Sequence, residues 1–476
     1  MPTIIKPDIC VIGAGSGGLS VAAAAAALGV HAVLIEKGEM GGDCLNYGCV
    51  PSKALLSAAK QAKAMREAVN FGVGTGEEPK IDMRSVNSHI KSVIAAIAPN
   101  DSEERFTAMG VTVIRETARF ANKNMVEAGD YQIRARRYVI ATGSSPFVPP
   151  ITGLDETDYF TNETIFENRR KLPHLIIIGG GPIGMEMAQA HNRLGSRVTV
   201  VEGLKALGKD DPETSGIVLD KLRAEGIEIL EGAKVTQVAK RGNKNVSVHI
   251  ETDDGTREIQ GSDILVATGR TPNIDDLNLE GARIKFDRKG IKVNSKLRTS
   301  NRRVYAIGDV AGALQFTHVA GYHAGQVIRS ILFRVGGSVN HNVIPWVTFT
   351  DPELAQVGMD EEAARKRYGT INVLRWPYHE NDRAQAERNT VGMIKIITDR
   401  RGVILGTSIV GANAGEMIHL WTLAITKKLK IGDITAYVAP YPTYSEIGRR
   451  AAVTYYAPLA RKPMIRSIIG FLRKFG

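Results

Sequence analysis

Two cysteines lie close together in the first part of the chain, Cys44 and Cys49, within the segment 41–53 of sequence GGDCLNYGCVPSK. Four residues separate them. If the segment is helical, the two thiols lie on adjoining turns, and a modest adjustment lets them form a disulfide. A close cysteine pair in a chain with few cysteines is more often catalytic or metal-binding than structural. The spacing therefore favours a pair that cycles between dithiol and disulfide.

Two other interpretations of this pair stay open, half of a zinc site and two inert buried thiols. A zinc site needs further Cys or His ligands close by. The remaining cysteine, Cys10, falls inside an apolar run typical of a strand. Three cysteines among 476 residues do not make a disulfide scaffold and suit a reducing compartment. We therefore expect redox chemistry without a resident metal, in a cytoplasmic protein.

A glycine-rich turn follows the strand predicted at 9–12, with Gly13, Gly15 and Gly18 in the GxGxxG pattern. An Ala-rich helix follows, and the next predicted strand ends at Glu36. The first glycine permits a tight turn, the second lets backbone approach a pyrophosphate, and the third lets the helix pack on the strand. The helix N-terminus offers N–H groups to phosphates, and the acid accepts from a ribose hydroxyl. This unit is predicted to bind a dinucleotide.

The same pattern occurs a second time, with Gly179, Gly181 and Gly184 in the turn and Glu202 at the end of the following strand. A single glycine-rich turn is weak evidence. Here each copy sits between a predicted strand and a predicted helix, and each has its acid about twenty residues further on. Two copies predict two dinucleotides bound by one chain.

Two later strands echo each other, 138–143 (YVIATG) and 264–270 (ILVATGR), and each ends in a turn of small residues. A further strand within 304–309 (VYAIGD) delivers the carboxylate of Asp309 at its end. From about Pro345 the pattern changes to strands and helices without glycine-rich turns, which indicates a separate α+β domain.

Together these motifs resemble the class I pyridine nucleotide-disulfide oxidoreductases, a family that includes dihydrolipoamide dehydrogenase, glutathione reductase and mercuric reductase. The resemblance extends to about residue 455, and the segments 41–53 and 267–273 (ATGRTPN) carry it most specifically. It implies an α/β fold with two Rossmann-like dinucleotide-binding domains, for FAD and NAD(P), and a C-terminal α+β dimerisation domain. The corresponding ranges are 1–150 and 273–344 for the two parts of the FAD-binding and central domain, 151–272 for the NAD(P)-binding domain, 345–460 for the dimerisation domain and 461–476 for a basic tail.

The resemblance also implies roles for individual residues. Cys49 would lie beside the flavin as a thiolate, and Cys44 would meet the acceptor. Lys53 would lie near the flavin N5, paired with Glu186, although the two could also form a plain surface ion pair. A nearby cation stabilises negative charge on reduced flavin and on thiolate. The expected nucleotide-binding residues are Gly13, Gly15, Gly18, Glu36, Gly42, Lys53, Gly143, Gly308, Asp309 (at the flavin ribityl chain), Gly179, Gly181, Gly184, Glu202 and Gly269.

The chain departs from the family near its C-terminus. Members that act on thiols carry a His-Pro-Thr motif whose His, held by a Glu five residues on, works in the partner subunit's active site. Here residues 439–446 read APYPTYSE, so Tyr441 takes the place of that His and Glu446 is retained. A phenol titrates near pH 10, against about 6.5 for imidazole, and the loss of a general base typically costs about 10²–10⁴ in rate. Tyr441 therefore argues against efficient dihydrolipoamide oxidation, or it is only an interface aromatic.

The expected function is hydride transfer from NAD(P)H through FAD to the Cys44–Cys49 disulfide and on to a small-molecule or metal-ion acceptor. The primary expectation is a dihydrolipoamide dehydrogenase-like reductase. Mercuric reductase also has Tyr at the position of Tyr441, which makes a metal-ion reductase an alternative. Its C-terminal cysteine pair has no counterpart here, because no cysteine follows Cys49. A membrane-surface electron-transfer flavoprotein and a non-enzymatic redox sensor are further alternatives.

Charge and composition limit the classes of binding partner that we expect. The net charge is +11, but no basic-aromatic nucleic-acid motif is apparent, so we expect no nucleic acid. No apolar run reaches the length of a membrane span, and no secretory signal is visible. Glu202 can accept from a free ribose 2′-hydroxyl and would repel a 2′-phosphate, so NADH should be preferred, with Lys205 close by. The resemblance implies a two-fold homodimer that forms through the C-terminal domain.

The last residues, 461–476, predict an amphipathic helix that begins at Pro463. Its apolar face lies opposite a basic face, and the segment contains no acidic residue. Such a helix suits peripheral contact with the inner membrane surface, or it docks on the protein's own dimer. The residues of the apolar face are Met464, Ile465, Ile468, Ile469, Phe471, Leu472 and Phe475. The basic residues are Arg461, Lys462, Arg466, Arg473 and Lys474.

Overall fold

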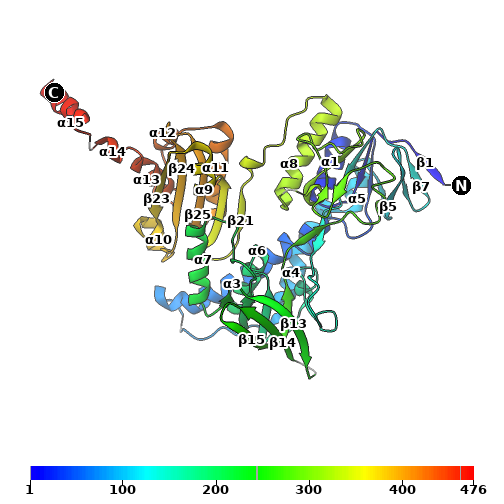
Figure 1. The fold of residues 1–476 in the computed structure, drawn as a ribbon, viewed down its shortest axis with the longest axis horizontal. Helices are drawn as coiled ribbons and strands as arrows, with labels where there is room; N and C mark the ends of the chain where they lie inside the picture. Colours follow the sequence, from blue (N-terminus) through cyan, green and yellow to red (C-terminus); the bar gives the residue numbers. More distant parts are fainter. Residues whose placement is uncertain (1, 75, 243–244, 313, 461, 476) are drawn as a thin grey trace. The chain divides into compact units, whose positions relative to one another are not determined.

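The computed structural model of the protein describes residues 2–74, 76–242, 245–312, 314–460 and 462–475. These residues form two compact units, one built from Met1–Gly203 and Leu230–Asn340 and the other from Leu204–Ile229 and His341–Gly476. Figure 1 shows the elements of both units. The domain boundaries expected from the sequence remain predictions, and the segment that contains α7 (Pro212–Ala224) clusters with the C-terminal unit.

The first nucleotide-binding unit is a parallel sheet with the strand order β20-β8-β2-β3-β4. Its central strands are buried at every residue, which fits strands covered on both faces. Helices α1 (Ser16–Ala27) and α8 (Thr317–Ile328) pack on one face, and a small sheet β1-β7-β6-β5 packs on the other. The strands of the parallel sheet are β2 (Ile9–Ile12), β3 (Ala32–Ile35), β4 (Thr112–Ile114), β8 (Arg137–Ile140) and β20 (Val304–Ala306). The strands of the small sheet are β1 (Thr3–Ile5), β5 (Ala118–Asn122), β6 (Met125–Ala128) and β7 (Tyr131–Ile133).

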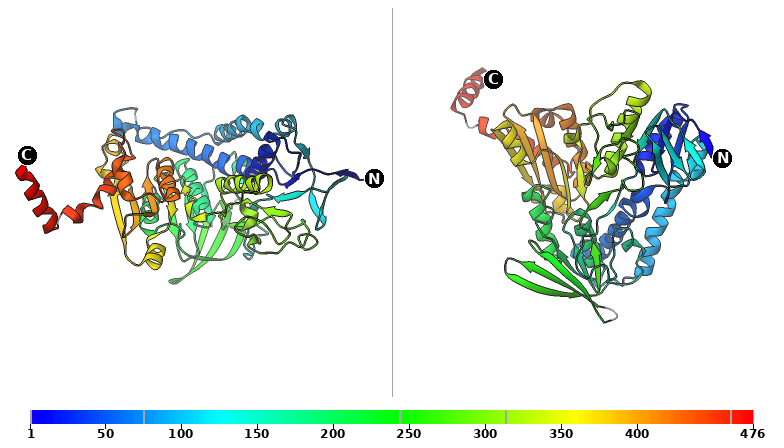
Figure 2. Two further views of the ribbon diagram at one scale, coloured as in Figure 1. Left: turned by 90° about the horizontal axis from the view of Figure 1, so that it is seen from above. Right: turned by 45° about the vertical axis from the view of Figure 1, so that its right-hand side comes forward.

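The second nucleotide-binding unit repeats this arrangement. Strand β10 (His174–Ile178) pairs in parallel with β11 (Arg197–Val201) and β16 (Asp263–Val266), and helix α6 (Pro182–Arg193) begins directly after the glycine-rich turn. An antiparallel sheet follows in the chain, drawn in green in Figures 1 and 2. Its strands are β13 (Lys234–Arg241), β14 (Asn245–Thr252) and β15 (Gly255–Gly261).

The cysteine segment connects the two nucleotide-binding units. It forms a short helix, α2 (Gly42–Asn46), and a long one, α3 (Cys49–Glu67). Helix α3 packs against both α4 (Met83–Ile97) and α6. Helix α3 thereby contacts elements of both predicted nucleotide-binding domains.

The second compact unit contains an antiparallel sheet with the strand order β21-β22-β25-β24-β23. Alternate residues of its strands face opposite sides, so Ile394 and Ile396 join an apolar core around Trp421, whereas Lys395 faces α7 and α9 (Glu361–Tyr368). The strands are β21 (Trp346–Thr348), β22 (Glu353–Gly358), β23 (Ile371–Pro377), β24 (Met393–Asp399) and β25 (Ile404–Gly411), and the core side is covered by α11 (Ala414–Lys427), α12 (Ile431–Ala436) and α13 (Glu446–Thr454).

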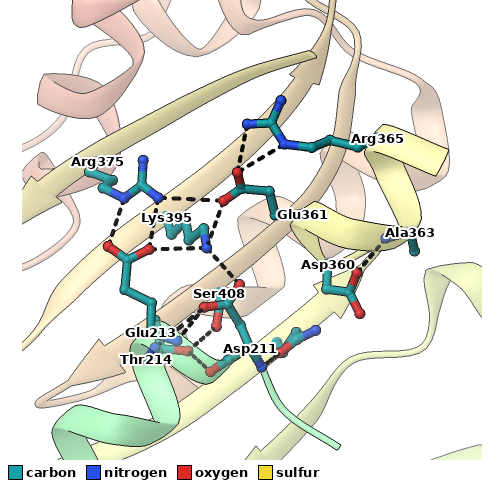
Figure 3. Close-up of polar contacts among 11 residues, drawn as sticks. Asp211, Glu213, Thr214, Asp360, Glu361, Ala363, Arg365, Arg375, Lys395 and Ser408 are labelled. Carbon is teal, nitrogen blue, oxygen red and sulfur yellow. Dashed lines mark hydrogen bonds and ion pairs between the residues drawn. The ribbon is translucent and has the colours of Figure 1, made fainter. Parts of the chain in front are cut away.

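An ion-pair network occupies the polar side of this sheet (Figure 3). Lys395 is 4% exposed, and its Nζ lies 2.8 Å from Asp211, 3.0 Å from Glu213 and 3.0 Å from Glu361. Arg375 pairs with the same two glutamates at 2.7 and 3.4 Å. Because each charge has partners of opposite sign, the network ties α7 and α9 to the sheet.

The C-terminal segment forms the expected helix, α15 (Pro463–Leu472). Arg461 and Gly476 lie outside the described residues. Most of the apolar side chains of this helix are exposed, including Phe471 at 59% and Leu472 at 58%. Among the described residues, no helix combines the length and the apolar composition needed to cross a membrane.

Candidate active site

The two glycine-rich turns have the same geometry. Gly13 has φ +104°, and a Cβ there would lie 2.4 Å from the Ala141 carbonyl oxygen. A Cβ at Gly18 would lie 1.8 Å from the Gly13 carbonyl oxygen. In the second turn, a Cβ at Gly179 would lie 2.4 Å from the Ala267 carbonyl oxygen, and a Cβ at Gly184 would lie 2.0 Å from the Gly179 carbonyl oxygen. The fold itself therefore requires the first and third glycine of each turn.

The middle glycine of each turn faces open space instead. Nothing lies within 4 Å of a Cβ built on Gly181, and the nearest atom to one built on Gly15 is the Gly42 Cα at 4.0 Å. A missing side chain that the fold does not require leaves room for a ligand to approach the backbone. The two turns therefore fit the pyrophosphates of two dinucleotides, which is the ligand chemistry expected from the sequence.

The acids expected to bind ribose lie beside these turns. Glu36 accepts hydrogen bonds from the N–H groups of Ala14 (2.6 Å) and Gly38 (2.7 Å). Glu202 accepts from the N–H of Gly180 at 2.7 Å. Each carboxylate is thus fixed against its own glycine-rich turn, where a bound ribose would lie.

The two cysteines lie on different helices. Cys44 belongs to α2, and Cys49 is the first residue of α3, because the chain leaves the helical conformation at Tyr47 and Gly48. A Cβ at Gly48 would come within 2.8 Å of the Asp43 carboxylate. A continuous helix through the segment, on which the predicted thiol spacing depended, does not form. The break instead places Cys49 at a helix N-terminus, where the helix dipole stabilises a thiolate.

The surroundings of the two thiols set them apart chemically. Both are free thiols here, and they are hydrogen-bonded to each other. The hydrogen bond from Cys44 lowers the pKa of Cys49 to about 6, against the effect of desolvation, with help from Thr317 and the charge of Lys53. The same hydrogen bond raises the pKa of Cys44, and desolvation adds to this. These surroundings favour the thiolate at Cys49 over the thiolate at Cys44.

Thr317 and Lys53 reach the cysteines from different elements. The Thr317 hydroxyl, at the start of α8, lies 3.3 Å from the Cys49 sulfur. Lys53 Nζ lies 2.7 Å from a carboxylate oxygen of Glu186 on α6. The Glu186 side chain is 6% exposed and that of Lys53 37% exposed. The ion pair thus links the cysteine helix α3 to the helix that follows the second glycine-rich turn.

A second polar cluster surrounds Asp309. Its carboxylate accepts from the Ser144 hydroxyl at 2.6 Å and lies 3.9 Å from the Arg270 guanidinium. Arg270 also donates to the Ser144 carbonyl (2.7 Å) and pairs with Asp43 at 3.0 Å. Burial raises the pKa of Asp309, although Ser144 and Arg270 oppose the shift. Gly143, Gly269 and Gly308 all have positive φ in the turns of this cluster, and the ion pair between Arg270 and Asp43 places the cluster beside the cysteine segment.

Comparison with known sequences agrees with this geometry. Residues 7–324 match the family described as pyridine nucleotide-disulphide oxidoreductase, and residues 344–452 match the dimerisation domain of the same family. The mercuric reductase of Bacillus cereus is 34% identical over 451 residues, which cover 94% of this chain and 71% of that protein. The dihydrolipoyl dehydrogenase of Geobacillus stearothermophilus is 33% identical over 456 residues, with 94% and 96% covered.

The chain belongs to the pyridine nucleotide-disulphide oxidoreductase family. This confirms the resemblance, the mixed α/β fold class and the expectation of an FAD-dependent disulfide oxidoreductase that uses a pyridine nucleotide. The HOCl-induced flavoprotein disulfide reductase RclA from Escherichia coli has a similar structure, with a TM-score of 0.84, 27% identity and coverage of 94% of this chain and 99% of that one. A Cu(II) complex of RclA is similar to the same degree, with a TM-score of 0.83.

The C-terminal segment that contains Tyr441 and Glu446 lies at the surface of the single chain. Tyr441 is 68% exposed, and its hydroxyl donates to Asp382 at 2.8 Å. This hydrogen bond raises the pKa of Tyr441. Glu446, the first residue of α13, is half-buried. The phenol is thus held by Asp382, and at neutral pH it can donate a hydrogen bond but cannot act as a base.

Sequence reasoning overlooked three residues of the site. Thr317 contacts Cys49 across 268 positions of sequence, and no local motif marks it. Arg270 follows Gly269 in one of the two similar turns, so its position could be noticed, but no role was predicted for its side chain. Ser144 follows Gly143 in the other turn and joins Arg270 to Asp309.

Proposed function

We propose that the protein transfers hydride from NAD(P)H through FAD to the Cys44–Cys49 disulfide, and that the resulting dithiol reduces an external acceptor. The observation that carries the proposal is the position of Cys49 at the N-terminus of α3, 3.3 Å from the Thr317 hydroxyl, where the Cys44 thiol, Thr317 and Lys53 lower its pKa. Such a pair has the thiolate that flavin-linked disulfide chemistry needs and the thiol that meets the acceptor. FAD, when bound, passes the electron pair between nicotinamide and disulfide.

The chain's own residues divide this work. Gly15 and Gly181 leave room for the two pyrophosphates, and Glu36 and Glu202 are placed to accept from the riboses. Lys53, held by Glu186, supplies positive charge where electrons arrive at the flavin and the disulfide. Asp309, held by Ser144, is placed to bind the flavin ribityl chain. Thr317 donates to the Cys49 thiolate.

We further propose that the acceptor is a soft, thiol-binding metal ion rather than a dithiol or disulfide metabolite. Tyr441 cannot serve as the base that thiol substrates need, because its phenol is protonated and engaged with Asp382. Thiolate pairs are preferred ligands of soft metal ions. The relatives include mercuric reductases, and RclA has been solved with Cu(II). One Hg²⁺, or two Cu²⁺, would take the two electrons released as the Cys44–Cys49 disulfide re-forms.

A comparison of acceptors tests this assignment. Purified FAD-loaded enzyme is assayed for NADH oxidation with Hg²⁺, Cu²⁺, lipoamide, glutathione disulfide and a quinone, with excess external thiol for the metals. We expect the highest kcat/KM with a metal ion, and its loss in both Cys44→Ser and Cys49→Ser. If lipoamide or glutathione disulfide surpasses the metals, the acceptor assignment is wrong although the flavin–disulfide step stands.

The nucleotide preference follows from Glu202. Its carboxylate lies at the turn where the adenosine ribose is expected, and a 2′-phosphate there would meet a negative charge. We therefore propose that NADH is preferred over NADPH. Steady-state kinetics with both nucleotides should give the higher kcat/KM for NADH, and the reverse preference would contradict the assignment.

The dimerisation match at residues 344–452 supports a two-fold homodimer. If Tyr441 works in the neighbouring subunit's site, activity depends on that assembly. Light scattering at assay concentration should give the mass of a dimer. A monomer with full activity would contradict the proposal.

The tail supports peripheral contact with an anionic membrane. Helix α15 exposes Met464, Ile468, Phe471 and Leu472 in the single chain, and the tail carries only basic charges. Each basic residue near an anionic leaflet adds about 1 kcal/mol. A chain truncated after Ala460 should keep its activity and co-sediment less with phosphatidylglycerol liposomes than the full chain does. If the full chain ignores these liposomes at low salt, or truncation abolishes activity, the tail docks on the protein itself.

A further inference from the structure

A strongly basic cavity of about 300 Å³ lies in the first compact unit, away from the cysteines. Among the described residues that line it, five are cationic and none is acidic. They are Arg136, Arg137, Lys296, Arg298 and Arg334. The cavity thus concentrates one sign of charge in a confined space, which raises the local concentration of anions.

The cavity lies at the N-terminal ends of the parallel strands, whereas the first glycine-rich turn follows the C-terminal end of β2. Arg137 is the first residue of β8 and pairs with Ile9, the first residue of β2. The turn at Gly13 follows the last residue of β2, about 10 Å further along at roughly 3.3 Å per residue. The cavity is therefore distinct from the expected flavin cradle in the same domain.

The positive charge in the cavity is largely uncompensated. Arg136 pairs with Asp8 at 3.2 Å. Within the described ranges, the structure shows no carboxylate within ion-pair distance of Arg137, Lys296, Arg298 or Arg334. This differs from Lys395, whose single ammonium group has three carboxylates within ion-pair distance.

Arg298 is fixed in place without an acid. Its guanidinium lies over the ring of Tyr305, 5.5 Å from the centroid, and donates to the Tyr305 hydroxyl at 3.2 Å. Its Nε is buried without a hydrogen-bond partner among the described protein atoms. Ser330, on the π-helical turn after α8, lies 3.3 Å from the same hydroxyl. An arginine held by an aromatic ring is pre-organised and keeps its charge for a ligand.

The positive charges that line the cavity affect the pKa of the Tyr305 phenol. Burial by itself raises its pKa, but hydrogen bonds with Ser330 and Arg298 and the charges of Arg298 and Arg137 bring the pKa below its usual value. The shift agrees with an excess of positive potential inside the cavity. Arginine, lysine and hydroxyl donors that converge without an acid are the donor set that binds phosphate oxygens.

We propose that this cavity binds a small multivalent anion that carries phosphate groups, at a site separate from both dinucleotide sites. Its volume of about 300 Å³ is at the lower end of the range for ligand pockets and suits a small ligand such as pyrophosphate. The phosphate belongs to a soluble metabolite or to a phospholipid headgroup, which share this chemistry.

Calorimetric titration with inorganic pyrophosphate tests the site. The FAD-loaded enzyme is saturated with NAD⁺, which occupies the dinucleotide site, in low-salt buffer without phosphate. We expect one saturable site per chain, whose Kd rises at least tenfold in Arg298→Gln and several-fold in Lys296→Gln. Lys296 is exposed, so its substitution leaves folding intact and keeps the test decisive if Arg298→Gln misfolds.

Arg302→Gln is the matched control, because Arg302 is an exposed cation of the same domain that does not line the cavity. Its Kd should change less than twofold. The proposal fails if the wild type shows no saturable heat, or if Arg302→Gln weakens binding as much as Lys296→Gln and Arg298→Gln do.

The source of the phosphate is decided in the chain truncated after Ala460, which removes any contribution of the tail. Co-sedimentation with phosphatidylglycerol vesicles that is lost in Arg298→Gln would assign a headgroup. Pyrophosphate binding without vesicle association would assign a soluble anion.

Discussion

The cysteine pair and the Lys395 network are both polar clusters. They differ in how fully each charged group is paired with groups of opposite charge. Lys395 is 4% exposed and is held by three carboxylates (Figure 3). Cys49 is exposed, and its neighbours stabilise a thiolate without pairing it directly with a cation. The first arrangement suits a fixed structure, and the second keeps a reactive atom available. The basic cavity resembles the second arrangement.

The largest expected effect is on stability, when the Lys395 network is broken. In Lys395→Met, the carboxylates of Asp211, Glu213 and Glu361 lose their shared cation. Removal of one partner from a buried ion pair typically costs about 3–5 kcal/mol. Denaturant unfolding should show a loss of this size, whereas the flavin spectrum after reduction should be unchanged.

Lys366→Met on the same helix as Glu361 is the matched control. Lys366 is exposed, and substitution of such a residue usually changes the free energy of unfolding by less than about 0.5 kcal/mol. Equal effects of the two substitutions would show that the network adds nothing to stability, and the comparison with the cysteine site would lose its meaning.

An intermediate effect is expected on the pH dependence of the cysteine pair. A thiolate exists above its pKa, so the Cys49 thiolate should be present at pH 7 and disappear as the pH falls through about 6. Thr317→Val removes a hydrogen-bond donor to that thiolate, and the pKa of Cys49 should rise by about one unit. Absorbance of the reduced enzyme between pH 5 and 8 measures this. An unchanged midpoint would exclude Thr317 from the site.

The smallest effect is expected at Tyr441. Tyr441→Phe removes one exposed hydrogen bond to Asp382, which solvent can replace. Turnover with metal ions should slow modestly, while the rate of flavin reduction by NADH stays normal. Tyr441→His should raise activity with dihydrolipoamide. If neither substitution changes turnover, Tyr441 serves only in packing.

The sequence predicted the elements that depend on local patterns. The strand at 9–12 has the predicted bounds, and the next strands of the two units end at Ile35 and Val201, directly before the predicted acids, because short apolar runs end at glycine turns or at an acid. The break between α2 and α3 was missed, because the close approach of Gly48 to Asp43 is a packing constraint rather than a propensity.

The rest of the site depends on contacts between distant parts of the chain. Thr317 reaches Cys49 only because α8 packs on α1, and Arg270 reaches Asp43 only when the two echoing turns meet. The Lys395 network joins residues up to 184 positions apart, and no local pattern indicates it. Lys53 and Glu186 could be paired only through resemblance to a family.

Anaerobic titration with NADH tests the central claim, that Cys44 and Cys49 are the redox pair and that Cys49 lies at the flavin. The wild type should develop a long-wavelength charge-transfer band after about one equivalent of NADH. Cys49→Ser should abolish the band, and Cys44→Ser should show it without any reductant. If neither substitution alters the flavin spectrum, the cysteine pair is not the redox centre of this protein.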